Sequence, residues 1–267
     1  MRLLFWNMNR LDLPTNVAEL SWQENADVLI LAECGSTATQ LLLALNERKP
    51  HYQFAPGNCG HLLFFTRFDS NYLKGMIETH RISIRKLTRP GLNELLIAAA
   101  HLPSKQDLSD ESQIFEAVHF ARLIEDAEKR CGHQRTVVIG DLNMNPFESG
   151  MVAASGGLHA VGSRRVAARE RRTVHQQPYR FFYNPMWAHL GDRAETAGTY
   201  YYESGEPLCY FWNLFDQVLL RPALLDGFSH DQVRIVTTIG GSSLLRDGCP
   251  DKDMVSDHLP LVVEISG

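Results

Sequence analysis

VVIGDLNMNPFE, residues 137–148, is the stretch that decides the fold class. The apolar, β-branched run at 136–139 is typical of a buried central strand, and it ends at Gly140. Asp141 and Asn143 follow directly, and because alternate residues of a strand point the same way, we expect their side chains on one face. α/β proteins commonly hold their binding and catalytic groups at such strand ends. This stretch therefore predicts an α/β protein with a polar site at the rim of a sheet.

Short apolar strands recur along the chain, with helical patterns between several of them. The clearest helical pattern is ESQIFEAVHFARLIEDAEKR (111–130), which stops before Gly132. The first half alternates strands and helices and the last third is mostly strands and loops, which favours mixed sheets over a purely parallel one. The predicted strands are LLFW (3–6), DVLILAE (27–33), HLLFFTRF (61–68), LLIAAAH (95–101), TVVIGD (136–141), FDQVLL (215–220), RIVTTI (234–239) and PLVVEI (260–265).

The domain organisation follows from the absence of dividing segments in the sequence. No repeat, low-complexity tract or Pro/Gly-rich linker separates the 267 residues, so we expect a single catalytic domain over residues 1–267. A long insertion is expected at about 150–205, after the GDLN strand. It contains SRRVAARERR (163–172) and the aromatic stretches PYRFFYNPMW (178–187) and TYYYE (199–203).

Charge, cysteine content and hydropathy limit the cellular compartment and the binding partners that we expect for this protein. The formal net charge of −5 gives no global positive field of the kind that attracts nucleic acid or membranes, although a local basic patch remains compatible with it. The five cysteines are odd in number and include no CxxC pair, which favours free thiols over a disulfide framework or a zinc site. No window approaches the ~20 apolar residues of a membrane span, and the N-terminus lacks the apolar core of a signal peptide. We expect a cytoplasmic protein without membrane contact.

Polar residues collect at the predicted strand ends. Each alone has an ordinary structural explanation, such as a turn residue, a carboxylate at a helix N-terminus or a buried structural histidine. Independent turns, however, have no reason to supply carboxylates, amides and histidines together at so many strand ends. The residues concerned are Asn7, Glu33, His101, Asp141, Asn143, Asp216, Asp257 and His258.

Phosphoester hydrolysis with a hard divalent metal needs such a set of side chains. Mg²⁺ prefers oxygen ligands and keeps several waters, so one Glu with an Asn or Asp suffices to hold it. The attacking water needs a carboxylate or a histidine that orients and deprotonates it. The charge on the phosphoryl oxygens needs donors such as Asn and His. The sequence therefore predicts a phosphoesterase that uses Mg²⁺ or Mn²⁺.

The same motifs resemble a known family. GDLN (140–143), SDHLPL (256–261), the Asn in FWNMN (5–9), the Glu in ILAE (30–33) and FDQVLL (215–220) together resemble the endonuclease/exonuclease/phosphatase superfamily, which has the deoxyribonuclease-like fold. They occur in the family's order from residue 5 to residue 261. The resemblance implies a four-layer α/β sandwich, in which two packed mixed β-sheets are flanked by helices.

The resemblance also implies a metal site and a site for the attacking water. Glu33, with Asn7 and Asp257, resembles the divalent-metal site of the family. Asp141 resembles the residue that aligns or deprotonates the nucleophilic water. Asn143 would hold the nucleophile or a phosphate oxygen.

Two histidines complete the implied catalytic set. His258 resembles the histidine that contacts the phosphate, and Asp216 resembles the carboxylate that orients its ring. A buried Asp behind a His favours the imidazolium and fixes its tautomer, which makes the ring a better donor. His101 matches the branch of the family with a histidine at this position. Whether Asp141 or His258 is the general base stays open.

Three functions remain. The first is a nuclease, either an endonuclease or an exonuclease, that acts on DNA or RNA. The second is a phosphatase or phosphodiesterase that acts on a small or lipid-linked substrate, and the third is a non-catalytic binding module. The last is disfavoured because no expected catalytic position has been replaced. Nucleic acid is the expected partner because arginines after the GDLN strand would contact phosphates that flank the scissile one, although a solvated helix face explains them equally well. The predicted substrate-binding residues are Arg164, Arg165, Arg169, Arg171 and Arg172.

Overall fold

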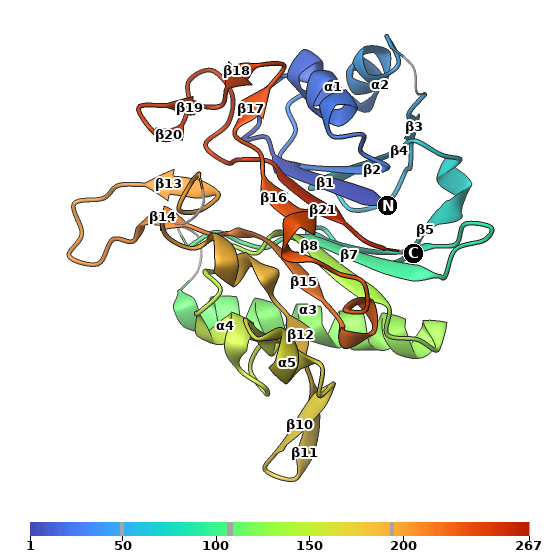
Figure 1. The fold of residues 1–267 in the computed structure, drawn as a ribbon, viewed down its shortest axis with the longest axis vertical. Coiled ribbons are helices and arrows are strands. Elements are labelled where there is room, and N and C mark those ends of the chain that lie inside the picture. The colour runs from blue at the N-terminus through green and yellow to red at the C-terminus, as the bar shows by residue number, and fades with distance from the viewer. Residues whose placement is uncertain (49–50, 106–108, 193–194, 267) are drawn as a thin grey trace.

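The computed structural model describes residues 1–48, 51–105, 109–192 and 195–266. Its helices and sheets form four layers, which Figure 1 shows from top to bottom. Helices α1 (Pro14–Gln23) and α2 (Ala38–Leu45) cover one mixed sheet, a second mixed sheet packs against the other face of the first, and helix α3 (Asp110–Cys131) covers the far side of the second sheet. The predicted α/β class and four-layer sandwich are confirmed.

The first sheet has six strands around the N-terminal strand. In spatial order they are β16 (Val233–Ile235), β21 (Leu261–Glu264), β1 (Arg2–Asn7), β2 (Val28–Ala32), β4 (Leu62–Thr66) and β3 (Gln53–Phe54). β1 and β2 run parallel, with Asn7 opposite Ala32. β21 runs antiparallel to β1, with Leu261 opposite Phe5, so the start of β21 lies beside the end of β1.

The second sheet has seven strands and contains the GDLN strand at its centre. In spatial order they are β5 (Leu73–Glu78), β6 (Ile82–Leu87), β7 (Leu95–His101), β8 (Thr136–Asp141), β15 (Asp216–Leu220), β12 (Phe182–Tyr183) and β9 (Ala160–Val161). β7 and β8 run parallel, and β15 runs antiparallel to β8. β9 and β12 come from the expected insertion, so part of the stretch 150–205 completes this sheet.

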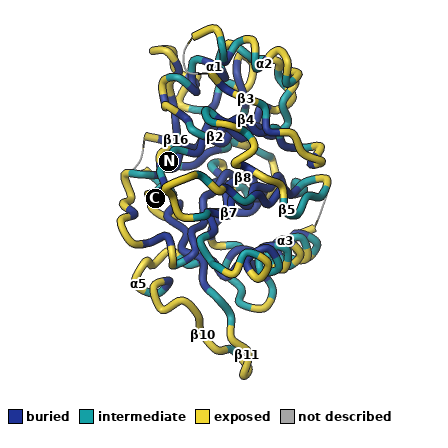
Figure 2. The backbone as a smooth tube through the Cα atoms, turned by 90° about the vertical axis from the view of Figure 1, so that its right-hand side faces the viewer, coloured by how far each residue is buried: buried dark blue, intermediate teal, exposed yellow. Residues whose placement is uncertain are grey.

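The remaining elements are short and lie outside the two sheets. Figure 2 shows one hairpin of this group projecting from the body with its backbone largely exposed. The 3₁₀ helices span Ser70–Tyr72, Pro185–His189, Pro222–Leu224 and His230–Gln232. The hairpins are β10 (Arg171–Val174) with β11 (Gln177–Arg180), β13 (Tyr200–Tyr202) with β14 (Phe211–Asn213), β17 (Thr238–Ile239) with β18 (Ser242–Ser243) and β19 (Leu245–Arg246) with β20 (Cys249–Pro250), and the short helices are α4 (Ser149–Val152) and α5 (Arg164–Ala167).

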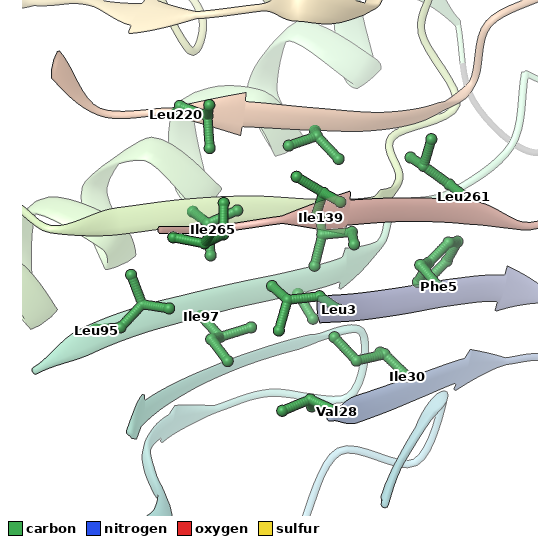
Figure 3. Close-up of a cluster of buried hydrophobic side chains, with 14 of the residues drawn as sticks. Leu3, Phe5, Val28, Ile30, Leu95, Ile97, Ile139, Leu220, Leu261 and Ile265 are labelled. Atoms are coloured by element: carbon green, nitrogen blue, oxygen red, sulfur yellow. The ribbon is translucent and has the colours of Figure 1, made fainter. Parts of the chain in front are cut away.

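The largest apolar cluster fills the space between the two sheets. Alternate residues of a strand face opposite ways, so Leu3 and Phe5 of β1 enter this cluster, whereas Leu4 and Trp6 pack against the layer of α1 and α2. Burial on both faces explains why the central strands read as near-continuous apolar runs. Figure 3 shows the inter-sheet contact, in which Leu3, Phe5, Val28, Ile30 and Leu261 of the first sheet meet Leu95, Ile97, Ile139 and Leu220 of the second.

Most predicted elements are present, with two differences in the sheets. The run 234–239 is divided, since β16 stays in the first sheet and β17 leaves it. Strands β5 and β6 were not predicted, because charged residues interrupt their apolar pattern. One of these, Arg85, is buried and paired with Glu78 at 3.0 Å, so its charge does not mark a solvent-exposed position. Within the described residues, no helix is long and apolar enough to cross a membrane.

Gly140 is required where β8 passes β7. A Cβ at this position would lie 2.0 Å from the backbone oxygen of Ala100, which is far inside van der Waals contact. We therefore expect Gly140→Ala to lower the free energy of unfolding by about 3 kcal/mol, the upper part of the range for overpacking. Urea denaturation measures this change. Gly205→Ala is the control, since nothing lies within 4 Å of its Cβ position; equal unfolding midpoints for the two variants would contradict the prediction.

Candidate active site

Strand ends from both sheets meet at one edge of the sandwich. Asp141 at the end of β8 lies between two neighbours in register, with His101 at the end of β7 on one side and Asp216 at the start of β15 on the other. Asn7 ends β1 on the first sheet, and its Nδ2 donates a hydrogen bond to Asp141 Oδ2 at 2.9 Å. The two sheets therefore share one polar site.

The Asp141 carboxylate is the centre of this site. It is almost fully buried, and its Oδ1 accepts a hydrogen bond from the backbone N–H of Asn143 at 2.9 Å. Two imidazole nitrogens approach its Oδ2, His101 Nε2 at 3.8 Å and His258 Nε2 at 3.9 Å. These distances are too long for direct hydrogen bonds, and they suit an intervening water or substrate oxygen.

His258 is held by a buried carboxylate. Its Nδ1 donates to Asp216 Oδ2 at 2.8 Å, and Asp216 is fully buried. Burial alone would lower the pKa of His258, but the Asp216 carboxylate, with Asp141 and Asp257, outweighs burial and raises the pKa to about 10. The ring of Tyr200 lies against the imidazole at 4.7 Å between centroids. The expected Asp–His pair is thus formed, and it leaves Nε2 directed toward Asp141.

The first sheet fixes the turn that carries His258. Ser256 Oγ donates to the backbone oxygen of Asn7 at 2.7 Å and accepts from the backbone N–H of His258 at 3.1 Å. Trp6 Nε1 donates to the backbone oxygen of His258 at 2.9 Å. The histidine is therefore anchored to β1, whereas its carboxylate partner comes from the second sheet.

The residues expected to bind a metal all line one pocket. Glu33 lines the pocket just after β2, and Asn7 Oδ1 accepts one hydrogen bond from the backbone of Asn9 at 3.1 Å, which leaves it a second lone pair. Asp257 Oδ1 is buried and has no hydrogen-bond partner among the described residues. Burial raises the pKa of Asp257, opposed by His258. Such an oxygen set fits a hard divalent cation.

The backbone around the site is strained at polar residues. Glu33 and Asn143 have φ values of 44° and 50°, and Asn9 and Arg10 beside them have 46° and 61°. Left-handed conformations cost energy in residues other than glycine, and they persist where surrounding structure holds them in place. Asn143 is so held, since its Nδ2 donates to the backbone oxygen of Leu102 at 2.8 Å. This hydrogen bond ties the side-chain amide of Asn143 to the backbone of Leu102. The expected contact of Asn143 with the nucleophile stays a prediction.

A pocket of about 670 Å³ opens over this site. Its rim includes Arg10 and Arg81, which the sequence reading did not select, and the hairpin β13–β14, which exposes Tyr202 and Tyr210. Seven of the eight polar residues expected at the strand ends line this pocket, and the eighth, Asp216, lies buried behind His258. The sequence carried no local signal for the two arginines, which stand alone in loops.

The structure places the five predicted substrate-binding arginines elsewhere. None of them lines the pocket. Arg164 donates to the backbone oxygens of Leu225 and Phe228, beyond the end of β15 that lies away from Asp216, and Arg172 donates to His159 Nε2 at 2.9 Å. Arg171 and Arg172 lie on the hairpin β10–β11, which Figure 1 shows at the bottom of the molecule, away from β13 and β14. Proximity in sequence to the GDLN strand did not bring these arginines into the pocket, and their contact with substrate phosphates stays a prediction.

A histidine that the sequence reading passed over lies next to the site. His61 Nδ1 is 3.3 Å from His101 Nδ1, and its Nε2 is 3.0 Å from His80 Nε2. Burial lowers the pKa of His61 to about 4, aided by the positive charges of Arg81 and neighbouring histidines. One ligand atom from each of Glu33, His61 and His101 lies within 4.8 Å of the others. His61 was the first residue of a predicted strand, and that position alone gave it no functional meaning.

Known proteins with a similar fold were found among solved structures. No protein-family model and no curated protein matches the chain. Among solved structures, the chain is similar over its full length to humanized D. rerio TDP2 (17% identity, 99% of that chain covered, TM-score 0.55) and to truncated Caenorhabditis elegans TDP2 (15% identity, 97% covered, TM-score 0.56). It is also similar, over 99% of its length, to an endonuclease/exonuclease/phosphatase family protein from Bacteroides thetaiotaomicron (13% identity, 97% covered, TM-score 0.54). The chain has the fold of the endonuclease/exonuclease/phosphatase superfamily, as its motifs predicted.

Glu33 is the carboxylate on which the expected cation depends most. We expect Glu33→Gln to keep the fold and to weaken Mn²⁺ binding by more than tenfold, because a neutral amide replaces the charged ligand. Titration followed by electron paramagnetic resonance measures the affinity. Glu19→Gln is the matched control, since Glu19 pairs with Arg48 on the surface at 3.1 Å. Unchanged Mn²⁺ affinity in Glu33→Gln would remove Glu33 from the metal site.

Proposed function

We propose that this protein is a divalent-metal-dependent phosphodiester hydrolase, a nuclease that cleaves DNA or RNA by in-line attack of water with Mg²⁺ or Mn²⁺. One observation carries the proposal. Asn7 Nδ2, His101 Nε2 and His258 Nε2 converge on a single carboxylate oxygen, Asp141 Oδ2, at 2.9, 3.8 and 3.9 Å. Phosphoryl transfer needs this combination of a fixed acceptor and several donors, because its catalysis is mostly positioning and charge stabilisation.

The side chains divide the work between water and phosphate. Asp141 Oδ2 accepts a hydrogen bond from the attacking water, and the Asn7 amide keeps that oxygen in place. His258, charged through its contact with Asp216, donates from Nε2 to a phosphoryl oxygen. His101 Nε2 supplies a second donor on the opposite side of Asp141. A bound cation, held by Glu33 and Asp257 with Asn7, would neutralise charge on the phosphate.

Nucleic acid as the substrate is supported by the rim of the pocket. Arg10 and Arg81 line it and are placed to contact backbone phosphates next to the scissile one. Tyr202 and Tyr210 are half exposed on the same rim, and exposed aromatic rings stack on unpaired bases. Similar solved structures are described as endonuclease/exonuclease/phosphatase family proteins, a name that covers nucleases and phosphatases alike.

A panel of substrates tests the activity directly. We expect Mg²⁺-dependent cleavage of single-stranded DNA or RNA, faster than hydrolysis of bis(p-nitrophenyl) phosphate, and little release from the monoester p-nitrophenyl phosphate. Asp141→Asn is the control protein, because it keeps the shape of the site and removes the anionic acceptor. Cleavage that is equally fast in Asp141→Asn would come from a contaminant, and absence of cleavage of every diester would reject the proposed function.

The Asp216–His258 pair should behave as one unit in catalysis. We expect Asp216→Asn to lower kcat/KM by at least tenfold, because an amide cannot hold the imidazolium. The double variant with His258→Ala should be barely worse than His258→Ala alone, since coupled residues are non-additive. Steady-state kinetics on the cleaved diester measure the four proteins of this cycle, and thermal unfolding checks that each is folded. Independent, multiplying losses would contradict the coupling.

A second candidate is a phosphatase or phosphodiesterase on a small phosphoester. The observation that favours it is the position of the arginine segment, which lies away from the pocket and offers no basic path leading out of it. A pocket of about 670 Å³ is large enough for a small organic phosphate. The two functions differ in whether phosphates beyond the scissile one are bound.

Salt dependence of binding separates these two functions. For single-stranded nucleic acid the log–log salt slope is about −0.7 per neutralised phosphate. We expect Arg10→Ala with Arg81→Ala to make the slope shallower by about 1.4 units, on that per-phosphate basis. Fluorescence anisotropy of a labelled oligonucleotide, without divalent ion to prevent cleavage, measures it.

The hairpin arginines provide the matched pair for this measurement. Arg171→Ala with Arg172→Ala removes the same charge from the exposed hairpin β10–β11, and we expect no change in slope. A shallower slope in the hairpin pair would instead show that the polymer reaches the arginine segment. No change in either pair, with both proteins folded, would favour the small phosphoester.

A further inference from the structure

Three histidines form a continuous chain from the surface to the active site. His80 Nε2 lies 3.0 Å from His61 Nε2, and His61 Nδ1 lies 3.3 Å from His101 Nδ1. His101 Nε2 then lies 3.6 Å from Glu33 Oε1 and 3.8 Å from Asp141 Oδ2. The phosphodiesterase chemistry described above uses only the last ring nitrogen of this chain. The proposed chemistry therefore gives no role to the Nδ1 atoms of His61 and His101.

The spacing of the central pair matches metal coordination. Two nitrogens that each bind Zn²⁺ at about 2.0–2.1 Å in a tetrahedral site lie about 3.3 Å apart. His61 Nδ1 and His101 Nδ1 are 3.3 Å apart. A carboxylate is also at hand, since Glu33, His61 and His101 each offer one ligand atom within 4.8 Å of the others. Two imidazoles and one carboxylate form a ligand set that zinc commonly takes.

The opposite nitrogen of each ring has a partner of its own. His61 Nε2 faces His80, and His101 Nε2 faces the carboxylate of Asp141, which is not a ligand of the proposed ion. Histidines that bind a metal through one nitrogen usually have the other nitrogen held in this way, which fixes the tautomer and the orientation of the ring. The Nδ1 atoms of the two rings thereby lie next to each other, at 3.3 Å.

A buried ion pair holds the loop that carries His61. The Arg85 guanidinium is 3.0 Å from Glu78 and donates to the backbone oxygen of Ala55 at 2.8 Å, while Glu78 Oε2 accepts from the backbone N–H of Asn58 at 2.6 Å. The backbone N–H of His61 donates to the oxygen of His80 at 3.3 Å. Loop 55–61 is thus tied to β5 and β6, so the histidine pair is positioned by buried structure.

We propose that Glu33, His61 and His101 form a second cation site, which takes a first-row transition ion of the Zn²⁺ type and shares Glu33 with the Mg²⁺ site. Imidazole nitrogens favour such ions, whereas Mg²⁺ favours oxygen ligands. A carboxylate that bridges two cations is the arrangement of two-metal phosphoesterases. The inference extends the proposed function through Glu33, although the binding it describes needs no substrate.

The charges that face the site permit this binding. Arg10 Nε lies 3.7 Å from Glu33 Oε2, but the Arg10 side chain is 82% exposed and is free to turn into solvent. Arg81 Nη1 points to the backbone oxygen of His101 at 3.5 Å. Asp141 and Glu33 supply negative charge on the other side of His101. An ion at this point would replace the exposed Arg10–Glu33 contact.

Zn²⁺ binding in the presence of saturating Mg²⁺ tests the proposal. Competition with a chromogenic chelator gives the Zn²⁺ affinity of the full chain, and Co²⁺ in its place gives the visible absorption of a tetrahedral nitrogen–oxygen site. We expect one ion per chain in the native protein. His80→Ala, which removes only a partner of His61, should weaken binding by about tenfold. His61→Ala should weaken it further and abolish the Co²⁺ spectrum.

His119→Ala is the control, because His119 is an exposed histidine on α3 outside this cluster. It should bind Zn²⁺ as the native protein does. Native affinity in a folded His61→Ala, or equal losses in His61→Ala and His119→Ala, would overturn the second site. Should His61→Ala not fold, His61→Gln replaces it in the same comparison. Zn²⁺ binding that depends on His61 in a protein without diesterase activity would support this site while rejecting the proposed function.

Discussion

The apolar contact between the two sheets is the constraint on which the site depends. Leu3, Phe5 and Ile30 of one sheet pack against Ile97 and Ile139 of the other, and all are excluded from solvent. Because this packing fixes how the sheets are placed along the strands, the ends of β1 and β8 meet at one edge. The hydrogen bond of 2.9 Å from Asn7 to Asp141 crosses from sheet to sheet at that edge. Loss of inter-sheet packing would separate the two halves of the site even if every polar residue were kept.

Negatively charged side chains are concentrated at the candidate site. Glu33, Asp141, Asp216 and Asp257 lie around one pocket or directly behind it, and His258 compensates mainly Asp216. Elsewhere in the core, buried charges are paired, as in Arg221 with Glu128 at 2.8 Å and Arg85 with Glu78 at 3.0 Å. A buried charge without a partner is costly, so Asp257 Oδ1, which has no hydrogen-bond partner among the described residues, supports the proposed cation site.

The polar residues of the candidate site lie apart from the arginine segment 163–172. The strand ends hold the polar residues rigidly, whereas the rim of the pocket is formed by loops and by the hairpin β13–β14. The hairpin β10–β11 carries Arg171 and Arg172 at the other end of the sheet, where β12 pairs with the far end of β15. The basic residues Arg10 and Arg81 that line the pocket stand singly in loops, and under the proposed function they would contact the substrate. Such residues are difficult to find from sequence because no local pattern surrounds them.

The sequence by itself determined the strands, their buried character and the polar residues at their ends. Runs such as TVVIGD and LLIAAAH are apolar because both faces of the strand are buried, and that property is local enough to be read residue by residue. Strands β5 and β6 were not predicted, because the charge of Arg85 is neutralised by Glu78 only within the folded sheet. Only the tertiary structure decided that His61 faces His101 at 3.3 Å, and that Arg164 points to the backbone oxygens of Leu225 and Phe228 instead of the pocket. Both outcomes depend on the packing of loops between distant strands, and sequence spacing carries no information about which loops will meet.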